Sequence, residues 1–168
     1  MSEKSKISVT LKHKRAVIFD VQETLYSNGR LFSDTISFLE KLKKQGFLLA
    51  VLSNASKDYL DELLDGFKIS KYFDCVLSAR DYDTKKPDPM LIGVLVALLN
   101  DVSGDMLNKD DCVFIGDKPS TDIRCAKLSG IQSIRILRGV YANKIPDDEY
   151  EIADFEFKNF RDAETLFF

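Results

Sequence analysis

The stretch RAVIFDVQETL (15–25) joins an apolar run to a polar segment that begins at Asp20. The apolar part is short and rich in β-branched and aromatic residues, which is typical of a buried strand. Further runs of this kind are FLLAVLS (47–53), FDCVLSA (73–79), DCVFIGD (111–117) and QSIRIL (132–137), with ADFEF (153–157) as a candidate sixth strand. Asn28-Gly29 predicts the tip of a hairpin after the first strand. Several strands are apolar on both faces, which is typical of a mostly parallel sheet covered by helices on both sides.

Helical patterns lie between these strands. The segments predicted as helices are 33–45, 57–67, 90–100, 120–129 and 160–168. In the first helix we expect Ser33 to be the N-cap, and Ile36, Leu39 and Leu42 to form the buried stripe. The alternation of strands and helices predicts an α/β fold, a Rossmann-like three-layer sandwich with a mostly parallel sheet.

The whole-chain properties fit one domain. The chain has 168 residues and an apolar fraction of 45%, and we expect residues 1–14 to be a polar tail or edge segment and residues 15–168 to be a single domain. The net charge of −3 argues against a nucleic-acid protein held by bulk positive charge. No apolar run reaches the roughly 18 residues of a membrane span, and the N-terminus lacks the apolar centre of a secretory signal. We therefore expect a cytoplasmic protein with no nucleic-acid or membrane partner.

The cysteines and the histidine offer little chemistry. Cys75, Cys112 and Cys125 are odd in number and show no CxxC spacing, so neither a zinc site nor a disulfide framework is indicated. We expect buried free thiols. The single histidine, His13, precedes the first predicted strand, which leaves little for a histidine-based mechanism.

Polar residues with related chemistry stand where the predicted strands end, and ligands of open α/β sheets bind at that edge. These residues are Asp20, Ser53 and Asn54, Lys86 in the loop before Pro87, and Asp117 with Asp122 five positions later. Together they supply a nucleophilic carboxylate, a hydroxyl, an ammonium group and two more carboxylates. Phosphoryl transfer around a hard cation requires such a set.

Four segments carry a resemblance to a known family. VIFDVQETL (17–25), VLSN (51–54), KKPDP (85–89) and FIGDKPSTDI (114–123) resemble, in order, the four motifs of the haloacid dehalogenase (HAD) superfamily, and the likeness spans about residues 15 to 168. The resemblance implies that Asp20 attacks phosphorus and forms an aspartyl-phosphate. It implies that Asp20, the backbone carbonyl of Gln22 and Asp117 ligate Mg²⁺, and that Asp122 supports the metal or Lys86.

The resemblance also implies the roles of the remaining motif residues. Ser53 and the Asn54 amide would hold phosphate oxygens. Lys86 would neutralise charge between Asp20 and the phosphate. Thr24 would brace the turn of the first motif by a local bond.

The sequence departs from the family pattern at Gln22. Phosphatases of the family usually carry a second Asp at this position, which protonates the leaving group and then activates water. An amide cannot exchange a proton at neutral pH, and loss of a general acid–base costs roughly 10²–10⁴ in rate. Glu23 is adjacent, but in a strand-like exit its side chain would point away from the site.

Three functions follow from these features. The first is a Mg²⁺-dependent phosphatase, attenuated because of Gln22. The second is a non-catalytic phosphate-binding or interaction protein, and the third is a carbon–halogen hydrolase, whose metal-free chemistry Asp117 and Asp122 do not favour. The gaps from Thr24 to Ser53 and from Asn54 to Lys86 leave no room for the cap domain that many family members insert. An uncapped site suits a large phosphorylated substrate or a neighbouring subunit in a homo-oligomer.

Overall fold

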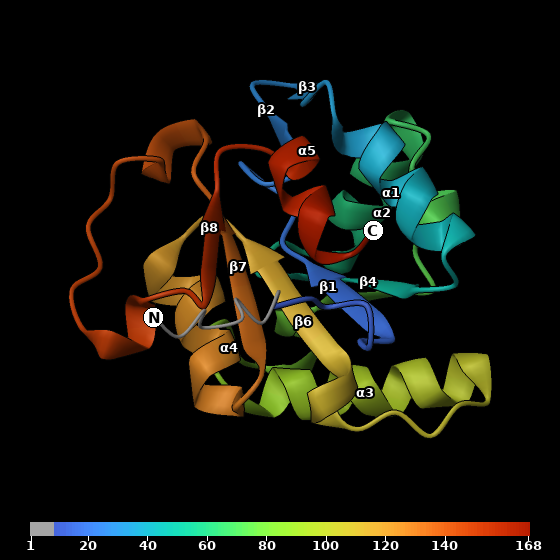
Figure 1. Cartoon of the computed structure of the whole chain (residues 1–168). Coiled ribbons are helices and arrows are strands. Elements are labelled where there is room, and N and C mark those ends of the chain that lie inside the picture. The colour runs from blue at the N-terminus through green and yellow to red at the C-terminus, as the bar shows by residue number, and fades with distance from the viewer. Residues whose placement is uncertain (1–8) are drawn as a thin grey trace, which may run out of the picture.

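The computed structural model describes residues 9–168 and contains one large sheet with helices on both of its faces (Figure 1). The strands of this sheet are β1 (Ala16–Phe19), β4 (Leu48–Ser53), β5 (Cys75–Ser78), β6 (Cys112–Gly116), β7 (Gln132–Ile136) and β8 (Phe155–Phe157). The helices are α1 (Thr35–Lys44), α2 (Lys57–Gly66), α3 (Met90–Ser103), α4 (Arg124–Ser129) and α5 (Phe160–Ala163).

The large sheet has the order β5-β4-β1-β6-β7-β8, and every neighbouring pair is parallel. The chain leaves β1 in one direction for β4 and β5 and then crosses to β6, β7 and β8 on the other side. β1 is therefore the point at which the strand order reverses, and its carboxyl end is where such sheets bind ligands. The α/β sandwich with a mostly parallel sheet that the sequence predicted is confirmed.

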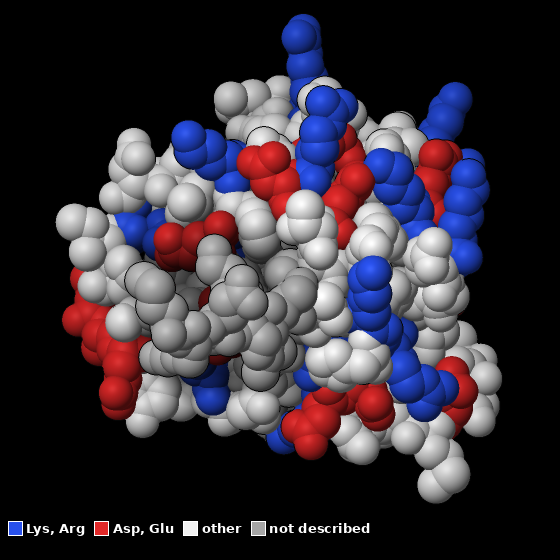
Figure 2. Space-filling view, in the orientation of Figure 1, with Lys and Arg blue, Asp and Glu red and all other residues white. Residues whose placement is uncertain are grey.

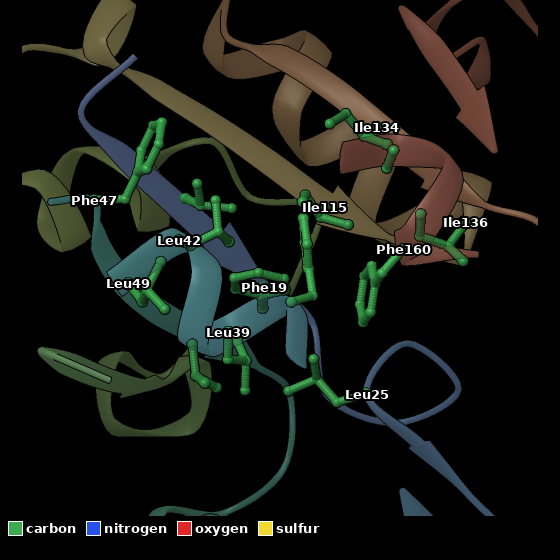
Figure 3. Close-up of a cluster of buried hydrophobic side chains, with 14 of the residues drawn as sticks. Phe19, Leu25, Leu39, Leu42, Phe47, Leu49, Ile115, Ile134, Ile136 and Phe160 are labelled. Atoms are coloured by element: carbon green, nitrogen blue, oxygen red, sulfur yellow. The ribbon is translucent and has the colours of Figure 1, made fainter. Parts of the chain in front are cut away.

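Alternate residues of the strands pack on opposite faces of the sheet. On one face Phe19, Leu49 and Ile115 pack against α1, α2 and the C-terminal segment (Figure 3). On the other face Ile18, Leu52 and neighbouring residues pack against α3 and α4. Both sides of the central strands are buried, which explains their near-continuous apolar sequence.

The predicted hairpin forms at the expected residues. Strands β2 (Tyr26–Ser27) and β3 (Arg30–Leu31) pair in antiparallel fashion. Asn28 and Gly29 both have positive φ, 49° and 72°, which is the backbone of a two-residue type I′ turn.

The first helix differs from the prediction at its start. It begins at Thr35 after Asp34, not after Ser33, and no side chain caps it. Its buried stripe is Thr35, Phe38, Leu39 and Leu42, whereas Ile36 is 43% exposed. The predictions for Ser33 and Ile36 were therefore wrong, because Asp34 is engaged elsewhere and the later start shifts the buried face of the helix.

Two other predicted helices are each divided. The segment 120–129 consists of a π-helical turn, Pro119–Ile123, followed by α4, which ends at Gly130 with φ 73°. The C-terminal segment consists of α5 and a 3₁₀ turn, Glu164–Leu166. The first part of the predicted N-terminal tail lies outside the described residues. In its second part Leu11 is buried and donates its backbone N–H to the carbonyl of Leu166 at 2.7 Å.

On the face shown in Figure 2, basic and acidic side chains of the described residues are interspersed. Within residues 9–168, none of the helices combines the length and the apolar character needed to cross a membrane.

Candidate active site

Three neighbouring strands deliver their end residues to the same place. β4, β1 and β6 lie side by side in the sheet, and their carboxyl ends lead to Ser53, Asp20 and Asp117. The backbone N–H of Asp20 donates to the carbonyl of Ile115 at 3.0 Å, which fixes the start of the first loop against β6. The convergence follows from parallel pairing, since all carboxyl ends lie at one edge.

Lys86 lies at the centre of the charges. Its Nζ is 2.6 Å from Oδ1 of Asp20 and 2.7 Å from Oδ1 of Asp122, and the three side chains are all largely buried. Burial alone would lower the pKa of Lys86, but the carboxylates of Asp122 and Asp20 outweigh it and raise the pKa. Lys86 is thus a permanent cation beside Asp20.

Asp122 holds the loop after β6 as well as Lys86. Its Oδ2 accepts the backbone N–H groups of Asp117 at 3.2 Å and of Lys118 at 3.1 Å. A Cβ at Gly116 would overlap the Asp122 side chain, so the close approach requires glycine there. These contacts fix the orientation of the Asp122 carboxyl group relative to the backbone of the loop.

Asp117 differs from the other two carboxylates in the hydrogen bonding of its oxygens. Its Oδ2 is buried and accepts no hydrogen bond from any of residues 9–168. Burial, together with the charges of Asp122 and Asp20, raises the pKa of Asp117 to about 9. Oxygen atoms of these three residues lie within 4.8 Å of one another. Three buried carboxylates around one lysine leave an excess of negative charge, and an all-oxygen donor set of this size fits a hard divalent cation.

Thr24 connects two of the carboxylates. Its Oγ1 lies 3.1 Å from Oδ2 of Asp20 and 3.0 Å from Oδ1 of Asp117, and the residue is fully buried. A hydroxyl has one proton, so it donates to one of these oxygens at a time. The local bond expected for Thr24 is present, and it extends to a second strand.

Ser53 and Asn54 lie on the other side of Asp20, at the end of β4. The Ser53 hydroxyl accepts the N–H of Ala55 at 3.1 Å, and Oδ1 of Asn54 accepts the N–H of Lys86 at 2.7 Å. The Asn54 side chain therefore positions the loop that carries Lys86. Ser53, Asn54 and Lys86 line the same cavity as Asp20, Asp117 and Asp122, so all residues that the sequence singled out for the site lie together.

Gln22 and Glu23 lie at the entrance. Gln22 is exposed and lines the cavity. Glu23 does not continue as a strand, because its φ is 64°. Its carboxylate accepts hydrogen bonds from Ser27 Oγ at 3.0 Å and from the N–H of Val140 at 3.2 Å. The strand-like exit expected at Glu23 was therefore wrong, and its side chain forms part of the cavity wall instead of pointing away.

Several residues of the site carry no motif and were missed. Arg138 donates to the Thr24 carbonyl at 2.6 Å and to Asp34 at 2.8 Å, and its guanidinium stacks on Phe32 and Phe160. Burial lowers its pKa. The missed cavity residues outside the four motif segments are Tyr26, Ala55, Tyr59, Leu60, Leu63, Val140 and Tyr141. Only the helical stripe of Leu60 and Leu63 had a signal in the sequence.

Comparison with known proteins identifies the family. The family model of haloacid dehalogenase-like hydrolases matches residues 2–136. The chain belongs to the haloacid dehalogenase-like hydrolases. Among this family, the phosphoserine phosphatase of Thermus thermophilus is 26% identical to it over 133 residues, which are 79% of this chain and 49% of that protein. The chain thus spans about half the length of this curated relative.

Solved structures of haloacid dehalogenase-like hydrolases agree with the fold. A predicted phosphoglycolate phosphatase from Haemophilus somnus has a TM-score of 0.70 and 27% identity, and covers 82% of this chain and 57% of that one. A 2-haloacid dehalogenase from Pseudomonas syringae has a TM-score of 0.65 and 26% identity, and covers 82% of this chain and 53% of that one. Similar chains thus carry names from two chemistries, phosphate-ester hydrolysis and dehalogenation.

Proposed function

We propose that the chain is a Mg²⁺-dependent phosphatase that acts through an aspartyl-phosphate on Asp20, with a low rate because Gln22 stands where a general acid–base is needed. The observation that carries this proposal is the bridge of Lys86 between Asp20 and Asp122, next to the buried and unpartnered Oδ2 of Asp117. The cluster has the negative charge to hold a cation and a lysine to meet a phosphate.

The chemistry begins at the carboxylate of Asp20. An oxygen of Asp20 attacks phosphorus, and the bond from phosphorus to the leaving oxygen breaks, so that this oxygen keeps the electron pair. The Lys86 ammonium lies beside the attacking carboxylate of Asp20, where it would balance the negative charge of the phosphoryl oxygens. The Ser53 hydroxyl and the Asn54 amide would supply donors for the same oxygens. Water then attacks the aspartyl-phosphate, which releases inorganic phosphate and restores Asp20.

Mg²⁺ would be held by Asp20, Asp117, Asp122 and the backbone carbonyl of Gln22, and when bound it supplies charge neutralisation for the phosphoryl group. The buried and unpartnered oxygen of Asp117 supports this assignment. Without a cation, the excess of buried negative charge would have to be relieved by protonation of a carboxyl group.

Proton transfer is the weak part of the site. The leaving oxygen needs a proton, and the attacking water must lose one. Gln22 can hydrogen-bond to either oxygen but cannot carry the proton. The Glu23 carboxylate is held in the wall by Ser27 and Val140, so it does not take over this task. The proton therefore comes from solvent, and the rate is reduced.

Phosphate and halide release decide between phosphatase and dehalogenase. We expect release of phosphate from small phosphate monoesters in the presence of Mg²⁺ and none after its removal with EDTA. Release of chloride from a 2-chloro acid without metal would favour a dehalogenase. This alternative is tested because a 2-haloacid dehalogenase is among the similar structures. The buried carboxylates of Asp117 and Asp122 argue against the dehalogenase function, because dehalogenation needs no cation site.

Beryllium fluoride, which binds aspartate as a phosphoryl mimic, separates the enzyme from a phosphate-binding protein. If the protein binds beryllium fluoride at Asp20 but hydrolyses none of the esters, it is a non-catalytic phosphate-binding protein with this fold.

A further inference from the structure

The cavity above Asp20 has two walls that the proposed phosphoryl chemistry does not use. It has a volume of about 250 Å³. One wall is formed by Tyr26 of β2 and by Tyr59 and Leu63 of α2, and the other by Val140 and Tyr141 of a 3₁₀ turn, Gly139–Tyr141. The space between the walls is where the organic part of a phosphate ester would lie.

The tyrosine wall is held in place by contacts within the protein. The hydroxyls of Tyr26 and Tyr59 are hydrogen-bonded at 3.0 Å. The ring of Tyr26 packs on Phe67, with centroids 5.3 Å apart. Tyr26 is 7% exposed, whereas Tyr59 is 48% exposed and presents a free aromatic surface. A fixed aromatic ring binds a second ring with little loss of side-chain freedom.

Hydrogen bonds within the protein also hold the second wall, Val140 and Tyr141, in place. The carbonyl of Tyr141 accepts a hydrogen bond from the buried Arg135 at 2.8 Å, and the N–H of Val140 donates to Glu23. A Cβ at Gly139 would overlap the Glu23 carboxylate, and the φ of this residue is 71°. The turn therefore has a defined place relative to the first loop, and glycine is required for it.

Charges of both signs lie on the walls. Glu23 contributes a fixed negative charge, which would repel a carboxylate or a second phosphate on the substrate. Lys118 lies over the ring of Tyr141, 4.8 Å from its centroid, which places a cation at the edge of an aromatic surface. The aromatic and apolar side chains of the two walls, Tyr26, Tyr59, Leu63, Val140 and Tyr141, offer a surface that suits a flat ring.

We propose that this cavity binds the ring of an aryl phosphate monoester, in which the phosphate is the only charged group. This inference rests on the proposed function. The chemistry of the leaving group agrees with it. The pKa of a phenol is about 10, whereas that of water, the stand-in here for an alkyl alcohol, is about 16. A phenolate is therefore the better leaving group, and it departs with its electron pair without a proton donor. Asp20 then gains the phosphoryl group while the phenolate takes its proton from water, and Gln22 needs to supply none.

Binding of two non-hydrolysable probes tests the aryl subsite without turnover. Titration calorimetry with Mg²⁺ would compare phenylphosphonate with methylphosphonate. We expect the phenyl compound to bind about tenfold more tightly, the upper range of one aromatic contact. Tyr59→Ala should reduce this ratio to about two, whereas Tyr59→Phe should keep it. Tyr150→Ala, which removes an exposed tyrosine outside the cavity, should leave the ratio unchanged.

A ratio near one in the wild type, or an unchanged ratio in folded Tyr59→Ala, would overturn the proposal. Hydrolysis separates this failure from that of the proposed function. If glycerol phosphate and phosphoglycolate are hydrolysed as fast as phenyl phosphate, the protein is a phosphatase without an aryl preference. If phenylphosphonate shows the Tyr59-dependent preference but no ester is hydrolysed, the aryl subsite stands and the catalytic proposal fails.

Discussion

Thr24 and Asp117 lie 93 residues apart in the chain, and a hydrogen bond of 3.0 Å joins Thr24 Oγ1 to Oδ1 of Asp117. The bond fixes one oxygen of this buried carboxylate and leaves Oδ2 without a partner. A side chain that is held in place and half satisfied is prepared for a ligand that the protein itself does not provide.

Mg²⁺ should therefore stabilise the fold through Asp117. At 100 times its Kd, a ligand that binds only the native state adds about 2.7 kcal/mol, and each kcal/mol raises the Tm by about 2–4 °C in a domain of this size. Thermal denaturation should show this rise in the wild type and not in Asp117→Ala. Asp101→Ala, at an exposed position of α3, is the control and should keep the rise. An unchanged wild-type Tm at 10 mM Mg²⁺ would contradict the metal assignment.

Asp20→Asn should abolish phosphate release and preserve the fold. The amide is nearly the same size as the carboxylate but is not a nucleophile in this reaction. Lys86 keeps its second carboxylate partner, Asp122, at 2.7 Å. Phosphate release by the purified variant, with its Tm and circular dichroism spectrum, checks both statements. Activity at the wild-type rate in this variant would show that the reaction occurs elsewhere.

Gln22→Asp should increase the hydrolysis of alkyl phosphate monoesters. The substituted side chain is exposed at the entrance of the cavity, so the change costs little stability. It supplies the missing proton carrier, and the rate should rise toward the roughly 10²–10⁴ that general acid–base catalysis contributes.

Gln22→Asn is the matched control, since it has the size of the aspartate but cannot act as a general acid or base at neutral pH, and it should show no gain. A loss of activity in Gln22→Asp would mean that the glutamine itself positions the substrate. Measurement of kcat and kcat/KM for the three proteins at several pH values distinguishes these results.

Removal of the guanidinium of Arg138 should strongly destabilise the protein. Arg138→Ala breaks the partly buried ion pair with Asp34 and the bond to the Thr24 carbonyl. Loss of one partner of a fully buried pair costs about 3–5 kcal/mol, and we expect the lower end of that range here. Urea denaturation measures the loss. Arg138→Lys should recover only part of it, because an ammonium group lacks the planar guanidinium that stacks on Phe32 and Phe160. Arg161→Ala, at an exposed position of α5, should change the free energy of unfolding by less than about 0.5 kcal/mol.

The three thiols should react slowly with alkylating reagents in the native protein, and Cys75 should be the first to react. Burial raises the pKa of Cys112 to about 11 and of Cys125 to about 12. At pH 8 the thiolate fractions are then about 10⁻³ and 10⁻⁴, whereas Cys75 is only half-buried. Mass spectrometry after timed iodoacetamide treatment gives the order. Rapid native labelling of Cys125 would contradict it, and all three should react after unfolding in urea.

The strands and the motif residues could be predicted because the signals are local. A buried strand such as Ala16–Phe19 must be apolar, and the polar residue at its carboxyl end must lie where the sheet binds ligands. Asp20, Ser53 and Asp117 follow from this rule alone. That they meet depends only on parallel pairing of the strands, which the alternation of strands and helices implies.

The wrong predictions concern residues whose partners are distant in the chain. Asp34 does not cap its own helix, because it accepts bonds from Arg138 and from the N–H of Phe160, 126 residues away. Glu23 takes a positive φ, a conformation that a glutamate adopts only when its surroundings hold it there. Propensity in a short window contains neither contact, and so the start of α1 and the shape of the entrance had to come from the structure.

The short connections around the sheet have a consequence for reactivity. Between Thr24 and Ser53 the chain forms only the β2–β3 hairpin, α1 and β4, and between Asn54 and Lys86 only α2, β5 and short 3₁₀ turns. In enzymes whose sites close over the substrate, closure keeps reactive intermediates away from competing nucleophiles. In the mechanism proposed here, an acyl phosphate on Asp20 has no such enclosure within these connections. Its phosphoryl group is then partitioned among water and any alcohol present at high concentration, so the fate of the intermediate is set by the composition of the solvent.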